Sequence, residues 1–166
     1  SLYIALCFDR EEADMKRTVF DVANWFLSKE SMTPKKLQKL VYYAYSWYLT
    51  LVNESKDDLT AKLFTSRLEA WVHGPVFPEL YQKYKGYSGE AIELYDGVIE
   101  EFNEDAKDIL DQVWEVYGGY TGNQLESITH RESPWLNARG GCSTYEICTN
   151  EISDADIFDC YIERVS

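Results

Sequence analysis

The stretch from Thr33 to Leu51 constrains the fold of this 166-residue chain more than any other feature. Thr33 is a favoured N-cap residue and Pro34 is favoured at the first helical position, so a helix is expected to begin here. Apolar side chains then recur at helical spacing over about four turns. They are Leu37, Leu40, Val41, Ala44, Trp47, Tyr48 and Leu51. We therefore expect this segment to form the central core helix.

The opposite face of the same helix carries Lys36, Lys39 and Tyr43. A lysine cluster near the start of a helix is most often a solvated face, and less often a patch that binds acidic groups. We favour the first interpretation, so this face is expected to contact water.

The segment 68–81 combines a strand-like aromatic run, a turn and the start of a helix. Gly74 has a free φ and Pro75 a fixed one, so the pair predicts a turn. Pro78 is placed to begin a helix that Gly86 can end. The segment holds no nucleophile–base pair, metal cage or phosphate loop, so we interpret it as determining shape.

Further helices are predicted where an N-cap residue precedes apolar spacing, after Thr18, Asn103, Thr121 and Ser153, with a helical turn at Ser133 to Trp135. The short apolar runs 62–64 and 68–72 can pair as strands. The fold class predicted is mainly α: a compact single-domain helical bundle, with one short β-hairpin before the Gly74–Pro75 turn as an optional element.

The chain is expected to form one domain, because its length suits one hydrophobic core. Met15 is a plausible natural start. Residues 1–14 are therefore interpreted as an N-terminal extension or a segment added for expression, and residues 15–166 as the domain.

Composition narrows the choice of partner. The formal net charge of −13 repels phosphates, so nucleic acid is disfavoured and a basic protein partner is favoured. The 25 aromatic residues suit both a core and an interface. No run of about 20 apolar residues is present, so no membrane span is expected. The four cysteines form no CxxC motif and are expected to be free thiols in the cytoplasm.

No metal-binding, nucleophile or phosphate-loop motif supports an enzyme. His130 with Cys142 and Cys148 matches no usual zinc-ligand spacing. Cys142 with His130 has no supporting local signature of a cysteine nucleophile. The pairs Gly118–Gly119 and Gly140–Gly141 lack the spacing of a phosphate loop. The sequence therefore predicts no catalytic residue, no metal and no cofactor.

Three separated motifs stand out: Thr33-Pro-Lys-Lys-Leu-Gln-Lys-Leu-Val-Tyr-Tyr-Ala, Glu69-Ala-Trp-Val-His-Gly-Pro-Val and Thr129-His-Arg-Glu-Ser-Pro-Trp. Together they closely resemble the Panacea family, the SocA-like antitoxin domain formerly known as a phage-associated domain of unknown function. The resemblance runs from about residue 18 to residue 162 and assigns the domain at 15–166 to this family.

The resemblance implies a bacterial or prophage antitoxin that neutralises a cognate protein toxin by direct binding. Delivery of the toxin to an ATP-dependent protease is a second mode open to such a binder. The resemblance also implies that the domain is not an enzyme. We place the partner-binding surface near Trp71, His73, Tyr81, His130 and Trp135. A purely structural role, in which such residues fix a turn and fill the core, stays open.

Two further functions remain as alternatives. The first is a DNA-binding transcriptional regulator, whose basic face would draw on Lys35, Lys36, Lys39, Lys83 and Lys85. The net charge of −13 weighs against it. The second is a hydrolase that uses His130 with Cys142 or Glu132.

Overall fold

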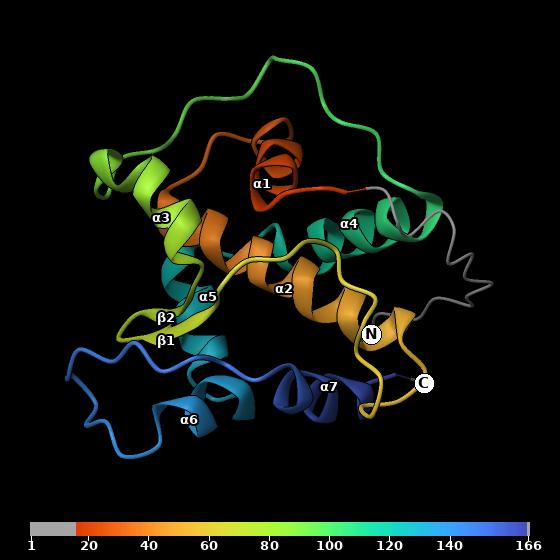
Figure 1. Ribbon diagram of the computed structural model, residues 1–166. Coiled ribbons are helices and arrows are strands. Elements are labelled where there is room, and N and C mark those ends of the chain that lie inside the picture. The colour runs from red at the N-terminus through yellow and green to blue at the C-terminus, as the bar shows by residue number, and fades with distance from the viewer. Residues whose placement is uncertain (1–15, 166) are drawn as a thin grey trace.

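The computed structural model describes residues 16–165. This part of the chain contains seven α-helices, one short 3₁₀ helix and one β-hairpin, joined by loops (Figure 1). The elements are α1 (Val19–Leu27), α2 (Pro34–Val52), β1 (Glu69–Trp71), β2 (Gly74–Val76), α3 (Pro78–Tyr84), the 3₁₀ helix η2 (Lys85–Tyr87), α4 (Glu104–Tyr117), α5 (Gly122–Thr129), α6 (Ser133–Arg139) and α7 (Asp154–Ile162). The mainly α fold is confirmed. The interpretation of residues 1–14 lies outside the described residues.

Helix ends follow the capping residues that the sequence indicated. Thr18 accepts a hydrogen bond from the backbone of Asp21, whose side chain binds the Thr18 N–H in return. Thr121 and Gln124 form the same reciprocal box at α5. These bonds satisfy backbone donors that a helix start leaves free, which explains why the predicted starts are confirmed.

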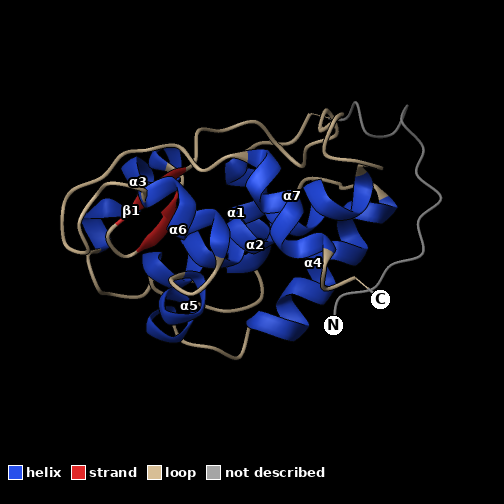
Figure 2. Ribbon diagram, turned by 90° about the horizontal axis from the view of Figure 1, so that it is seen from below, coloured by secondary structure: helices blue, strands red, loops and turns tan. Residues whose placement is uncertain are grey.

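Helix α2 runs through the middle of the molecule and contacts α1, α3, α4, α5, α7 and β2. Figures 1 and 2 show this arrangement from two directions, with the hairpin beside α3 and α6. From residue 37 to residue 50 every side chain of α2 is buried. The predicted solvated face is therefore wrong for Lys39 and Tyr43, which are 1% and 0% exposed. Neighbouring helices cover both faces, so most buried polar side chains of α2 find their partners in the protein.

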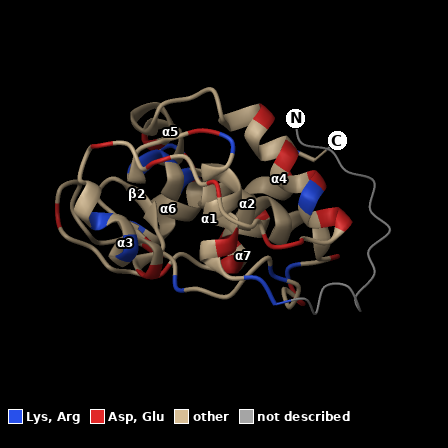
Figure 3. Ribbon diagram, turned by 90° about the horizontal axis from the view of Figure 1, so that it is seen from above, with Lys and Arg blue, Asp and Glu red and all other residues tan. Residues whose placement is uncertain are grey.

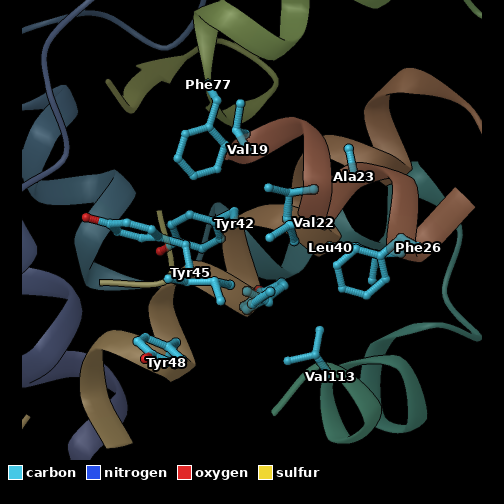
Figure 4. Close-up of a cluster of buried hydrophobic side chains, with 14 of the residues drawn as sticks. Val19, Val22, Ala23, Phe26, Leu40, Tyr42, Tyr45, Tyr48, Phe77 and Val113 are labelled. Atoms are coloured by element: carbon cyan, nitrogen blue, oxygen red, sulfur yellow. The ribbon is translucent and has the colours of Figure 1, made fainter. Parts of the chain in front are cut away.

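Side chains of α1, α2 and α4 pack together in the core. Figure 4 shows Val22 and Phe26 of α1 with Leu40 of α2 and Val113 of α4, and all four are fully buried. Burial of such a side chain stabilises the fold by about 1.5–3 kcal/mol. This contact fixes α1 and α4 on the central helix.

The β-hairpin differs from the predicted one. Strand β1 pairs antiparallel with β2, with Ala70 opposite Pro75, whereas residues 62–64 are not a strand. Gly74 and Pro75 thus lie inside β2 and not after the hairpin. Gly74 has a φ of +106°, which lets the chain reverse after only two connecting residues. On its other edge β1 pairs with the run 150–152, so β2 is an edge strand where Pro75 can lack an N–H.

Glu132 is a buried carboxylate that joins α2 to α7. Its Oε1 accepts hydrogen bonds from the hydroxyls of Tyr43, at 2.7 Å, and Tyr161, at 3.0 Å. Its Oε2 lies 2.7 Å from the guanidinium of Arg164. Burial raises the pKa of both tyrosines well above the ordinary value, with the charge of Glu132 adding to the effect, so both hydroxyls remain donors. The carboxylate is thus compensated by three groups from two segments, α2 and the end of α7, that are far apart in sequence.

Replacing Glu132→Gln should destabilise the protein by about 3 kcal/mol, because Tyr43, Tyr161 and Arg164 lose the charge they surround. Urea unfolding followed by circular dichroism measures the change. The exposed Glu115 of α4 supplies the control, since Glu115→Gln should change stability by less than about 0.5 kcal/mol. Equal effects of the two substitutions would show that the buried carboxylate does not hold α2 and α7 together.

Candidate functional site

An apolar pocket of about 310 Å³ opens between the start of α2, the hairpin and α3. Its walls are mainly apolar or aromatic, and they include Leu37, Trp71, Val76, Leu80, Tyr81 and Tyr84. A cavity of this size and character is typical of sites that receive a small molecule or a partner's side chain. The pocket exists because a Pro-initiated helix follows the hairpin directly and leans against the same face of α2.

Three of the five predicted partner-binding residues line this pocket: Trp71, His73 and Tyr81. The rings of Trp71 and Tyr81 meet edge to face, with centroids 4.9 Å apart. Tyr81 is 39% exposed, and the side chain of His73 is 69% exposed. These three residues are therefore accessible to a partner.

The other two predicted residues lie behind the hairpin, and neither lines the pocket. Trp135 is 7% exposed, and its indole N–H donates to the carbonyl of Trp71 at 2.8 Å. The His130 ring stacks on Trp135 at 4.0 Å between centroids. Burial lowers the pKa of His130, so the ring is neutral at pH 7. Both side chains support the strand that carries Trp71.

Glu126 organises the charges at the edge of the pocket. Its carboxylate lies 2.7 Å from the ammonium of Lys35 and 3.2 Å from Nδ1 of His73. Burial alone would raise the pKa of Glu126, but the hydrogen bonds from Lys35 and His73 outweigh burial and lower it. The ion pair connects α5 to α2 and orients His73 toward the opening. The sequence analysis did not identify Glu126.

Lys39 lines the inner end of the pocket, where its ammonium nitrogen donates to the carbonyl of Pro75 at 3.2 Å. Burial lowers the pKa of Lys39 to about 7, against the opposing effect of Glu126. A Cβ on Gly74 would lie 2.7 Å from Cε of Lys39, so only glycine leaves room for the lysine. The sequence held a signal for this burial, because no charged residue follows Lys39 in α2 and such a helix has no solvated face.

Gln38 fixes the chain where the hairpin leads into α3. Its amide accepts from the N–H of Phe77 at 2.9 Å and donates to the carbonyl of the same residue at 3.1 Å. The sequence analysis did not identify this role either. Together Gln38 and Lys39 bind Phe77 and β2 to α2, and these hydrogen bonds hold the floor of the pocket in place.

The three sequence motifs therefore meet at one place. The first supplies Lys39, the second the hairpin with Trp71, and the third Trp135 and Glu132, which contact the other two motifs. Most of these contacts are buried and stabilise the fold. The accessible surface that they hold in place is the pocket.

Among residues 16–165, no three His, Cys, Asp or Glu side chains lie close enough to hold a metal ion. None of the helices in this range combines the length and the apolarity needed to cross a membrane.

Comparison with protein-family models matches residues 37–136 to the description "Antitoxin SocA-like, Panacea domain". The match covers more than half of the chain and includes the pocket floor, the hairpin and Trp135. No curated protein and no solved structure matches the chain.

Substituting Lys39→Met should remove a pH dependence from the stability of the protein. The folded-state pKa of Lys39 is about 7 and the ordinary value is 10.5, so between these values the unfolded chain holds a proton that the folded protein has lost. Stability of the unsubstituted protein relative to Lys39→Met should therefore rise with pH across this window, by about 1.4 kcal/mol per pH unit. Below about pH 7 the difference should be constant, with Lys39→Met the more stable.

Urea unfolding at pH 6 to 10 measures this difference, with the exposed Lys107→Met as the control for loss of a positive charge. A difference that does not change with pH would mean that Lys39 keeps its ordinary pKa when buried.

Proposed function

The chain belongs to the SocA-like antitoxin family with a Panacea domain, and from this we propose that it neutralises a protein toxin by direct binding. We further propose that the two proteins form a toxin–antitoxin system of bacterial or prophage origin and act in the cytoplasm. In this proposal the protein acts as a binder and needs no catalytic residue or cofactor.

The observation that carries the proposal is the aromatic pair of the partly buried Trp71 and the exposed Tyr81, at an apolar pocket whose floor is hydrogen-bonded to α2. Binding energy in protein interfaces concentrates in a few aromatic or arginine residues that meet well-formed pockets. Because Gln38 and Lys39 already hold the floor in place, little binding free energy is lost in ordering this surface. We propose that the toxin inserts an apolar side chain here.

The charges around the pocket suggest what accompanies that side chain. Lys85 lines the opening, where its ammonium donates to the neutral side chain of Gln82, whereas Lys35 and His73 already contact Glu126 there. Lys83 lies in α3 and Lys85 in η2 directly after it, whereas the charged residues of α4 and α7 are mostly acidic (Figure 3). The toxin segment at the pocket should therefore place a carboxylate beside its apolar side chain. The remaining toxin surface should be basic, because a strongly acidic protein attracts a basic partner over a longer range.

A polar hollow of about 340 Å³ extends the same surface toward α5 and shares Lys35 and Ser88 with the pocket. The two hollows give the surface an apolar end and a polar end. A short extended segment of the toxin could occupy both, with its apolar residue in the pocket.

The contacts of the candidate basic residues give less support to a DNA-binding regulator. Lys39 is buried, and Lys35 and Lys36 form ion pairs with Glu126 and Glu30. Phosphate binding relies on lysines that are free to release counterions. The alternative hydrolase also loses support, because Glu132 is held by two tyrosines and Arg164.

Replacing Tyr81→Ala should weaken toxin binding at least about tenfold, or about 1.4 kcal/mol, because it removes half of the aromatic pair. The toxin to use is the product of the open reading frame beside the gene. Titration calorimetry gives the affinity, and growth of cells that express both proteins gives the neutralisation. The melting temperature should stay nearly unchanged, since Tyr81 is 39% exposed.

Tyr145→Ala is the matched control, because Tyr145 is an exposed tyrosine outside the pocket. Equal binding by both variants would place the toxin elsewhere. Restored growth without a captured complex would contradict direct binding and favour an indirect route, such as delivery to a protease or control of transcription.

Trp135→Ala should behave differently and lower stability by about 3–5 kcal/mol, because the side chain is buried under the hairpin. Thermal unfolding measures this loss. A Trp135→Ala protein that keeps its stability and loses only toxin binding would assign Trp135 to the interface instead.

A further inference from the structure

The loop 140–149 between α6 and the strand-like run 150–152 holds two cysteines whose sulfurs are almost in bonding contact. The Sγ atoms of Cys142 and Cys148 lie 2.6 Å apart. A disulfide bond measures about 2.05 Å, so a small movement brings the two sulfurs to bonding distance. Both residues are free thiols here. Free thiols agree with the expectation from the sequence, in which no CxxC spacing brings the two residues together.

The ends of the loop are anchored, so this proximity belongs to the fold. The N–H of Cys142 donates to the carbonyl of Arg139 at 2.7 Å. At the other end, the side chain of Asn150 donates to the carbonyl of Ala138 at 3.1 Å, and the backbone carbonyl of Asn150 accepts from the N–H of Ala70 in β1 at 2.9 Å. The two cysteines therefore leave and rejoin the same rigid part of the protein.

The interior of the loop is organised by one buried side chain. The guanidinium of Arg139, which is 4% exposed, donates to the backbone carbonyls of Ser143, Thr144 and Glu146. It also donates to the carbonyl of Ala70 in β1. These bonds curl the loop so that its start and its end, and with them the two thiols, approach each other.

The two thiols differ in access to solvent. Cys148 is 4% exposed, whereas Cys142 is only partly buried and can meet a reagent from solution. The hydrogen bond to Cys148 raises the pKa of Cys142 to about 11, so this thiol is protonated at neutral pH. The reactive thiolate of Cys142 is therefore a small fraction at neutral pH, and its reaction with an oxidant should be faster at higher pH.

We propose that Cys142 and Cys148 are a reversible modification site that closes to an intramolecular disulfide when a low-molecular-weight disulfide such as oxidised glutathione is present. The sulfur of Cys142, after losing its proton, attacks oxidised glutathione and releases one glutathione thiolate. The sulfur of Cys148 then attacks the mixed disulfide, loses its proton and releases the second glutathione. The protein loses two electrons and two protons, and oxidised glutathione becomes two glutathione molecules.

Closure affects an exposed part of the surface. Tyr145 and Ile147 lie between the two cysteines and are 87% and 88% exposed. A covalent link across their ends restricts the conformations that these side chains sample. The modification thus sets the order of this loop, and it does so independently of toxin binding.

The test uses the full chain, reduced and then incubated with oxidised glutathione, quenched with acid and alkylated. Peptide mapping by mass spectrometry should find a Cys142–Cys148 bond and two fewer alkylated thiols in each chain. Dithiothreitol should restore both thiols. Hydrogen exchange of the amides at 143–147 should slow several-fold in the oxidised protein and return to its former rate after reduction.

Variants separate this site from general thiol oxidation. Cys160→Ser should form the bond as the unsubstituted protein does, because Cys160 lies on α7 outside the loop. Cys148→Ser should instead retain a glutathione adduct on Cys142, and Cys142→Ser gives a second test if loss of the buried thiol impairs folding. The proposal fails if Cys142 and Cys148 stay alkylatable while Cys160 is modified, or if they form bonds only between molecules.

Discussion

Helix α2 is enclosed by protein on every side from residue 37 to residue 50, and water cannot satisfy its polar groups there. Several buried polar side chains of α2 therefore bind and position another segment. Lys39 binds β2, Tyr43 binds the start of α6, and Tyr45 binds Asp154 at the start of α7. An unpaired buried polar group costs about 1–3 kcal/mol, so these contacts allow few alternative arrangements. The enclosed helix determines both the fold and the position of the pocket.

Much of the architecture could be predicted because it depends on short-range rules. N-cap residues and Pro at the first helical position act within one turn, which explains the success at Thr18, Thr33, Pro78 and Thr121. The hairpin was misplaced because strand pairing is a contact between segments, and neither partner of β1 is specified by its own sequence. The run 150–152 lies about eighty residues from β1 and carries no local signal for pairing with it.

The candidate site was predicted in part for the same reason. Trp71, His73 and Tyr81 lie close together in sequence, and the turn between them brings them to one pocket. Glu126 reaches that pocket only through the packing of α5 on α2, and the sequence near Glu126 does not predict this contact. Lys39 was misread because the lysine cluster was judged without the uncharged run that follows it. Composition along the whole helix, and not the spacing of one stripe, decides whether a lysine meets water.

The Glu132 cluster also has a consequence for the order in which this protein can fold as it is synthesised. Tyr43 is made early, Glu132 about ninety residues later, and Tyr161 and Arg164 later still. A nascent chain that ends before α7 leaves the carboxylate without two of its three partners and α2 without one of its covering helices. Contacts of such long sequence separation form slowly, because a large loop must close before they stabilise anything. The native core therefore becomes complete only when translation has passed α7 and Arg164.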